Sequence, residues 1–138
     1  MSNQIVRQLI ESRLAVWAAS RAPTLPVDWE NVPFTPVNGT PYLRAFLLPA
    51  TTTSPDLAGA LRTWRGVYQV SVVTPLNAGA GVAERVAAEL DGLFPLNLRL
   101  LGQGLVLQIV SPVTAAKGAV DDVDFIIPVS FQYRADTA

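Results

Sequence analysis

The sequence contains neither cysteine nor histidine among its 138 residues. Without cysteine, the chain can form no disulfide framework, no thiolate nucleophile and no cysteine-based metal site. Without histidine, it lacks the commonest general base and the commonest transition-metal ligand. Because these absences close most routes to catalysis, we predict a protein that is not an enzyme, with no catalytic residues, no metal site and no cofactor.

Charge of either sign is scarce, since charged residues make up only 15% of the chain. Ten basic residues stand against eleven acidic ones, and the sequence pI is about 5.2. Lys117 is the only lysine, and no lysine–arginine cluster is visible along the sequence. A chain of this kind offers no basic field for nucleic acid, so we expect no specific nucleic-acid binding.

Long apolar runs are missing as well, because no uninterrupted stretch approaches the length that spans a bilayer. The N-terminal segment carries Glu11 and lacks a small-residue cleavage site, so we do not interpret it as a secretory signal. We therefore expect no membrane partner. Half of the residues are nevertheless hydrophobic, and the mean hydropathy is +0.33. A partner protein could cover apolar surface that one monomer cannot hide.

Apolar residues at helical spacing predict two helices. The first spans residues 3–19 and has a central apolar stripe with flanking residues that widen it: Val6, Ile10, Leu14 and Trp17, then Ile5, Leu9 and Val16. The second spans residues 81–94 and aligns four apolar residues before Phe94: Val82, Val86, Leu90 and Leu93. We expect Trp17 to be buried between the first helix and a sheet.

Six segments are predicted to be strands: residues 27–32, 42–48, 62–74, 96–101, 105–110 and 125–134. The segment 62–74 is the longest of them, and Gly102-Gln103-Gly104 predicts a hairpin between the fourth and fifth. Pro128 cannot donate a hydrogen bond to a neighbouring strand, so we expect the last strand to lie at an edge or to carry a bulge. Residues 50–61 and 111–123 are predicted to be mobile loops.

The order helix, strands, helix, strands predicts an α+β fold. We expect one mainly antiparallel or mixed β-sheet with two α-helices packed on one face. The sequence shows no internal repeat and no flexible linker, and its length suits one core. We therefore expect a single domain over residues 1–138.

The segment "NAGAG", residues 77–81, follows a predicted strand and precedes a predicted helix, as a phosphate-binding loop would. Gly79 and Gly81 supply two-thirds of a dinucleotide-binding pattern. Glu84 occupies the third glycine position, where its carboxylate would repel a pyrophosphate, and no P-loop lysine follows. We favour a turn in which the glycines relax the backbone and Asn77 caps the helix.

Three acidic residues, Asp121, Asp122 and Asp124, are close together before the last strand. A calcium loop needs six or more oxygen ligands with a glycine and a glutamate at fixed spacing, and this segment lacks them. We interpret it as a solvated acidic loop.

The predicted strand 62–74 also holds the candidate interface. Arg62 and Arg65 flank Trp64, a combination typical of binding hot spots. Val67 and Gln69 lie on the side of the strand away from its aromatic residues. A solvated beginning of the strand explains the same residues equally well, so both interpretations stay open.

Beyond these patterns, the chain resembles tail-terminator-like proteins of long-tailed bacteriophages and prophages. The resemblance is carried by a strand, a glycine-containing turn and a helix with these residues: Arg65, Gly66, Tyr68, Val70, Pro75, Gly79, Gly81, Phe94 and Pro95. The segment "TPYLRAFLLP", residues 40–49, is similar to the strand that precedes this block in that family.

The resemblance implies an α+β subunit that assembles with copies of itself into a ring, expected to be a homohexamer. Such a ring caps the tail tube protein and offers a surface to head-completion or connector proteins. It would reside in the virion tail, and in the cytoplasm of the bacterial host during assembly.

Two other functions remain open at this point. The chain could be a different neck or tail-completion component, or a tube subunit, with the same fold. It could also be a small-molecule-binding α+β domain or a hydrolase that uses carboxylates. A dry pocket with convergent polar groups would favour the latter class.

Overall fold

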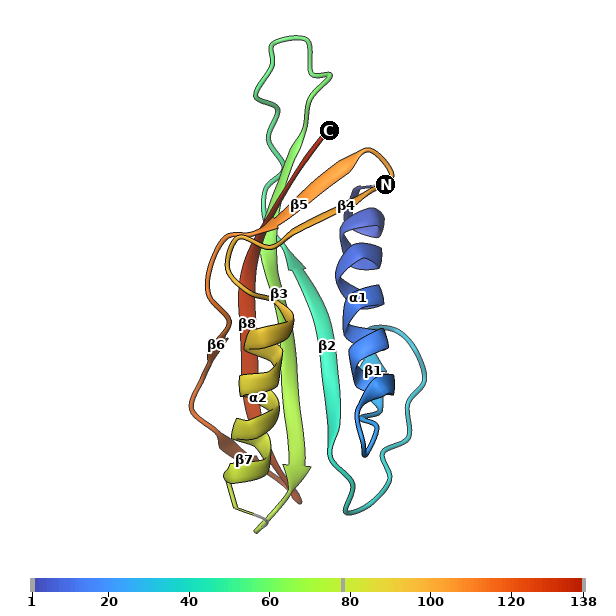
Figure 1. Ribbon diagram of the computed structural model, residues 1–138, viewed down its shortest axis with the longest axis vertical. Coiled ribbons are helices and arrows are strands. Elements are labelled where there is room, and N and C mark those ends of the chain that lie inside the picture. The colour runs from blue at the N-terminus through green and yellow to red at the C-terminus, as the bar shows by residue number, and fades with distance from the viewer. Residues whose placement is uncertain (1, 78, 138) are drawn as a thin grey trace.

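A curled eight-stranded sheet carries two helices on one face, so the α+β prediction is confirmed (Figure 1). This computed structural model describes residues 2–77 and 79–137. The elements are α1 (Ser2–Ser20), β1 (Val27–Trp29), β2 (Tyr42–Pro49), β3 (Thr63–Pro75), α2 (Gly81–Leu93), β4 (Arg99–Gly102), β5 (Leu105–Ile109), β6 (Thr114–Ala115), β7 (Ala119–Asp121) and β8 (Asp124–Thr137). The strand order is β1-β2-β3-β8-β5-β4, with β6 and β7 also paired to β8. The β1–β2 pair is parallel, and the other pairs of the described strands are antiparallel.

The β3–β8 pair forms the longest ladder of the sheet. Its register runs without a slip from Thr63 opposite Asp136 to Pro75 opposite Asp124. Strand β8 has 14 residues and β3 has 13, so the strand predicted to be longest is second by one residue. Side chains alternate along both strands. One set, with Tyr68, faces the helices; the other set, with Gln69, lies on what we call the outer face, the side of the sheet away from the helices.

Strand β8 lies inside the sheet, so the prediction that Pro128 places it at an edge is wrong. It pairs with β3 on one side and with β5, β6 and β7 on the other, and no bulge interrupts its register with β3. The carbonyl of Pro128 accepts a hydrogen bond from the Ala116 N–H at 2.8 Å. The Pro128 nitrogen lies on the same side of β8 as this carbonyl. On that side residue 128 faces the segment between β6 and β7, where no partner strand needs a backbone N–H from it.

Residues 111–123, predicted to be a loop, contain the two short strands β6 and β7. Thr114 lies opposite Ser130, and Ala119 lies opposite Ile126. Strands of two and three residues are too short to show alternation, so the sequence pattern could not reveal them.

Helix α1 buries the predicted stripe, with one correction at its end. Val6, Ile10 and Leu14 are fully buried, and the stripe continues to Ala18. Trp17 lies beside it, half-buried against the core, with the Arg21 guanidinium 5.6 Å from its ring centroid. The expected burial of Trp17 is thus only partly confirmed. Val16, predicted to widen the stripe, is 71% exposed, because a step of four residues continues from Leu14 to position 18.

Helix α2 buries Val86 and Leu90 as predicted, but the other two residues of its buried face differ from the prediction. Its buried residues are Ala83, Val86, Ala87 and Leu90. Val82 is exposed and Leu93 is half-buried. Phe94 follows the helix and stacks on Phe131 with ring centroids 4.7 Å apart. The small alanine side chains let the helix approach the sheet closely, and Phe94 fixes the end of the helix. Together these contacts determine which face of α2 is turned toward the sheet.

The turn before α2 confirms part of its interpretation. Gly79 has a φ of 81°, a conformation that glycine adopts without strain. Asn77 does not cap the helix, because the N-cap residue is Ala80 and no side chain bonds to the helix start. The hairpin between β4 and β5 is confirmed, with Gln103 and Gly104 both at positive φ as in a type I′ turn.

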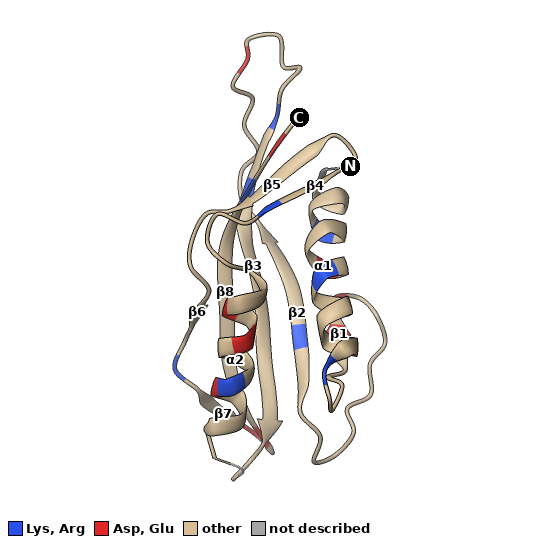
Figure 2. Ribbon diagram, in the orientation of Figure 1, with Lys and Arg blue, Asp and Glu red and all other residues tan. Residues whose placement is uncertain are grey.

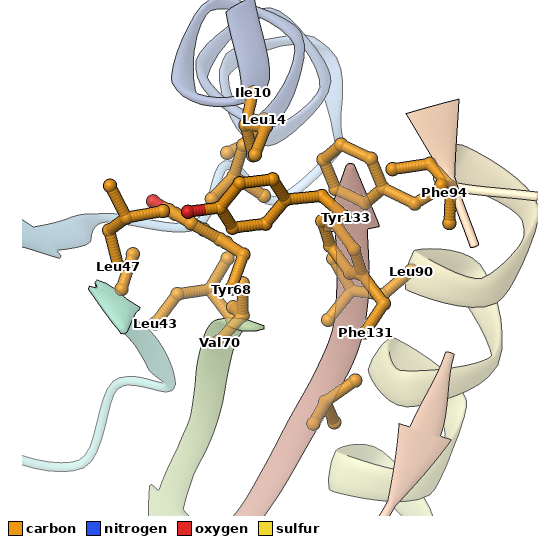
Figure 3. Close-up of a cluster of buried hydrophobic side chains, with 14 of the residues drawn as sticks. Ile10, Leu14, Leu43, Leu47, Tyr68, Val70, Leu90, Phe94, Phe131 and Tyr133 are labelled. Atoms are coloured by element: carbon orange, nitrogen blue, oxygen red, sulfur yellow. The ribbon is translucent and has the colours of Figure 1, made fainter. Parts of the chain in front are cut away.

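The core lies between the sheet and both helices (Figure 3). Tyr133 extends across its centre, beneath Ile10 and Leu14 of α1. In the register, Tyr133 lies opposite Gly66 of β3. A Cβ atom at Gly66 would lie 2.6 Å from the Tyr133 hydroxyl oxygen and 2.6 Å from the Leu48 carbonyl oxygen. The glycine of the arginine-glycine-x-tyrosine segment therefore leaves the space that the Tyr133 ring occupies.

We predict that Gly66→Ala lowers the free energy of unfolding by about 1–3 kcal/mol, because the added methyl group forces the strand or the Tyr133 ring to move. Gly92→Ala in α2 is the matched control, since no heavy atom lies within 4 Å of the position its Cβ would take. There the unfolding free energy should stay equal or rise by up to about 1 kcal/mol. Urea unfolding followed by circular dichroism measures both, and equal effects of the two substitutions would contradict the packing argument.

An ion pair joins the end of α1 to α2. The Arg21 guanidinium donates from Nε and Nη2 to the two carboxylate oxygens of Glu89, at 3.0 and 2.7 Å. The hydrogen bond from Arg21 lowers the pKa of Glu89 from its ordinary value of 4.5. A carboxylate whose pKa is lower in the folded than in the unfolded state stabilises the fold at pH values above its unfolded-state pKa. This stabilisation is lost as the pH falls through the pKa of the folded state.

We predict that Glu89→Gln lowers the unfolding free energy at pH 7 by less than about 1 kcal/mol, because the pair is partly exposed. The difference from the wild type should shrink as the pH falls below 4.5. Glu84→Gln, at an exposed position in the first turn of the same helix, serves as the control and should lose only the favourable interaction of a carboxylate with the helix N-terminus, about 0.3 kcal/mol in an exposed position. A pH-independent difference for Glu89→Gln would contradict the assignment.

Candidate interaction surface

The outer face is partly covered and partly open. Near the start of β2 the outer face is covered. Tyr42 lies opposite Val73, and both residues are buried. Phe34 packs on Tyr42 with the two ring centroids 5.0 Å apart. Ser71 is also buried there. Further along, the outer-face residues of β2, β3 and β8 become half-buried or exposed: Phe46, Leu48, Val67, Gln69, Arg65, Ser130, Gln132 and Arg134. The open part is the candidate interaction surface.

The free edge of β2 is closed against strand addition. Beyond β1, the backbone N–H of Leu47 donates to the Glu30 carboxylate at 2.7 Å, and Pro49 has no N–H. Glu30 is itself paired with Arg7 at 3.0 Å. An edge with its donors capped or absent does not template another strand. This contact also explains why β1 ends at Trp29, three residues short of the predicted 27–32.

The cluster behind this edge is structural. Arg7 also pairs with Glu11 at 3.1 Å, and the Tyr68 hydroxyl donates to Glu11 at 2.8 Å. Burial raises the pKa of Tyr68 well above its ordinary range, and the nearby Glu11 carboxylate adds to this. A phenol held neutral and hydrogen-bonded inside the fold fixes α1 on the sheet.

The five predicted interface residues are divided by the fold. Arg65, Val67 and Gln69 share the outer face, as expected from their alternation, with Arg65 exposed and the other two half-buried. Trp64 points to the opposite side and packs against the core, so it does not lie between the two arginines on one surface. Arg62 precedes β3 and is exposed. Val73, on the same side as Arg65, is 1% exposed and cannot contribute to an interface.

The sheet assembles an arginine cluster that the linear sequence does not show. The register places Arg99 opposite Gln108, Gln108 opposite Arg134, and Arg134 opposite Arg65. We call these residues the arginine row; they cross β4, β5, β8 and β3 on the outer face. Figure 2 shows basic positions in this part of the sheet, near the chain termini. The sequence-based statement that no basic cluster exists holds only along the chain.

Little within the molecule neutralises this row. Arg134 donates from Nε to Asp136 at 3.0 Å, whereas Arg65 donates to the Thr53 hydroxyl at 3.3 Å. In residues 2–77 and 79–137, neither Arg65 nor Arg99 forms an ion pair. Like charges directly opposite each other in neighbouring strands are destabilising. The row is therefore a surface that favours contact with an anionic group.

Other candidate sites are weaker. Among the described residues, no group of three acidic, histidine or cysteine side chains could hold a metal ion. The carboxyl groups with shifted pKa values are Glu89 and Asp136. The pKa of Asp136 is lowered because hydrogen bonds from Thr63 and Arg134 outweigh its partial burial. Neither carboxyl is held protonated as an acid catalyst would be. In the described part of the chain, neither helix combines the length and apolarity needed to cross a bilayer.

Comparison with known proteins gives a family match and a similar solved structure. A family model described as phage tail terminator protein matches residues 5–133. A solved structure with a TM-score of 0.84 is 44% identical in sequence, over 98% of this chain and 96% of that one. The name recorded for that structure states no function. No curated protein matches the chain.

We predict that Arg65→Thr raises the unfolding free energy by a few tenths of a kcal/mol at low salt, because it removes a like charge opposite Arg134 and introduces a residue favoured in strands. The gain should shrink at high salt, where charge repulsion is screened. Arg44→Thr is the control: Arg44 lies on the same face but pairs with Asp28 at 3.7 Å, so its loss should not stabilise. Urea titrations at two salt concentrations test this; a salt-independent effect of Arg65→Thr would contradict it.

Proposed function

The chain belongs to the phage tail terminator family, and from this membership we propose that it forms a ring that caps the tail tube and contacts head-completion proteins. As a member of this family it is a phage tail assembly protein. We further propose that the ring is a homohexamer in the virion tail, built from subunits made in the host cytoplasm.

The observation that carries this proposal is the family match over residues 5–133, which includes every element from α1 to most of β8. The open outer face adds physical support. A closed ring needs heterologous contacts, in which one patch of a subunit meets a different patch of the next. Such a contact usually buries roughly 800 Å² per partner, about a tenth of the 7715 Å² surface of this chain.

A projecting segment provides a second surface for neighbours. Residues 50–62 extend beyond the sheet at the end where β2 leaves it (Figure 1). Leu57 in this segment is fully exposed, and Leu61 is 44% exposed. Exposed large apolar side chains on a projecting loop are typical of contact sites. We assign this segment to contacts with the tube end or with a head-completion protein.

The proposed role requires no chemistry of the chain. Membership in a structural family suggests a non-enzyme, and the contacts of such a protein are made by shape, apolar area and charge. No cofactor is needed for any of these contacts.

We expect the purified protein to form closed rings at high concentration, or to cap the ends of added tail tubes. Negative-stain electron microscopy of the protein alone, of tubes alone and of the mixture tests this. Gold-labelled protein should appear at one end of each tube. Label along the tube length would instead identify a tube subunit, and absence of both rings and end binding would refute the terminator role.

A further inference from the structure

Two exposed surfaces of opposite charge lie at opposite ends of β8. One is the arginine row. The other is the turn between β7 and β8, which we call the acidic tip; it carries three carboxylates and two exposed valines: Asp121, Asp122 and Asp124, with Val120 and Val123. Figure 2 shows acidic positions beside β7, at the end of the molecule away from the termini. In residues 2–77 and 79–137, none of the three carboxylates forms an ion pair.

We propose that the acidic tip of one copy docks on the arginine row of the next copy. This inference rests on the proposed ring, and it names the two different patches that a heterologous contact requires. Three carboxylates would then face three guanidinium groups, of which Arg65 and Arg99 form no ion pair among the described residues and Arg134 shares Asp136.

The two surfaces cannot satisfy each other within one molecule. Asp124 and Arg134 are separated by ten residues of the same extended strand, roughly 33 Å at the usual rise per residue. No side chain spans that distance. A contact between the acidic tip and the arginine row therefore has to come from a second copy.

Apolar groups accompany the charges on both sides. At the acidic tip, Val120 and Val123 are 64% and 61% exposed. Beside the arginine row there is a depression of about 470 Å³, whose lining includes Arg65, Arg134, Val67 and Val110. A valine of the tip fits such a depression while the neighbouring carboxylates reach the arginines. Burial of these apolar groups would supply affinity, and the charges would fix the orientation.

Nucleic acid is the less suitable occupant of the arginine row. A phosphate backbone offers no apolar group for the depression, and the chain carries a net charge of −1 with Asp121 and Asp122 of its acidic tip exposed to the same polymer. A second copy supplies both the carboxylates and the valines. The observations therefore favour protein carboxylates over phosphates.

Charge reversal tests the row first. Arg65→Glu should raise the protein concentration needed for half-assembly by roughly tenfold or more, a typical effect of a close interfacial charge pair. The variant should still fold, because the new carboxylate lies directly opposite Arg134. Arg85→Glu makes the same change of charge at an exposed position of α2 and should shift assembly less than about twofold. Analytical ultracentrifugation with electron microscopy measures assembly.

Complementation then tests the pairing. A row-reversed variant carries Arg65→Glu and Arg134→Glu, and a tip-reversed variant carries Asp121→Arg and Asp122→Arg. Each alone should fail to assemble. An equimolar mixture should form rings again, because the row of each variant now matches the tip of the other.

Disulfide trapping provides a readout that does not depend on charge. The natural chain has no cysteine, so a Val123→Cys, Gln132→Cys variant has one thiol at the tip and one beside the row, and the two single-cysteine variants control for 123–123 and 132–132 bonds, which end at dimers. Oxidation should give a ladder of covalent oligomers up to the ring. The control pair Val123→Cys, Val82→Cys should give no ladder, since Val82 lies on helix α2.

The outcomes separate this proposal from the ring itself. If wild-type protein forms rings but the reversals leave assembly unchanged, or the mixture fails to recover it, the ring stands and this pairing is overturned. If wild-type protein forms neither rings nor tube caps, the proposed function fails. Row-dependent binding of wild-type protein to duplex DNA, with assembly unaffected by reversal, would identify nucleic acid as the occupant and overturn the pairing.

Discussion

The unbroken register between β3 and β8 is the constraint on which the other elements depend. Alternation along thirteen consecutive pairs assigns every side chain of both strands to one of two faces. A slip of one residue would bury Arg65 and Gln69 and expose Tyr68, so burial itself fixes the pairing. Once the pair is set, β2 is added beside β3, and β5 is added beside β8. Both helices then cover the apolar face that results.

The same constraint leaves the outer face incomplete. Among the described residues, the segment before β2 folds over part of that face through the contact of Phe34 with Tyr42, and Thr63 is buried at the far end of β3. Beyond these contacts the chain has no third layer to add, because both helices are committed to the core side. The open region, where Gln69 and Arg134 lie, is thus a consequence of a two-layer fold in a short chain. This uncovered half-polar sheet face is the surface on which the proposed assembly contacts depend.

Sequence patterns predicted the elements whose alternation is long, and failed where a pattern was short or ambiguous. The long strands and the Gln103-Gly104 hairpin follow from alternation and turn chemistry. In α2 the buried Val86 and Leu90 were predicted, whereas Ala83 was missed because alanine is only weakly apolar and Val82 seemed a better core residue. Pro128 led to the wrong prediction of an edge strand or bulge, because its missing N–H affects hydrogen bonding only on one side of β8. The arginine row depends on the register of four strands, which no single segment specifies.

A low overall charge makes the position of each charge more consequential. With ten basic and eleven acidic residues, copies of the chain repel each other little, and their orientation depends on where the few unpaired charges lie. Because β8 runs between both ends of the sheet and is paired along both of its sides, it holds Asp124 and Arg134 at a fixed separation. A rigid strand with opposite charges at its two ends gives every copy the same polarity. Contacts of one polarity repeat around a ring, whereas contacts between like ends would stop at a dimer.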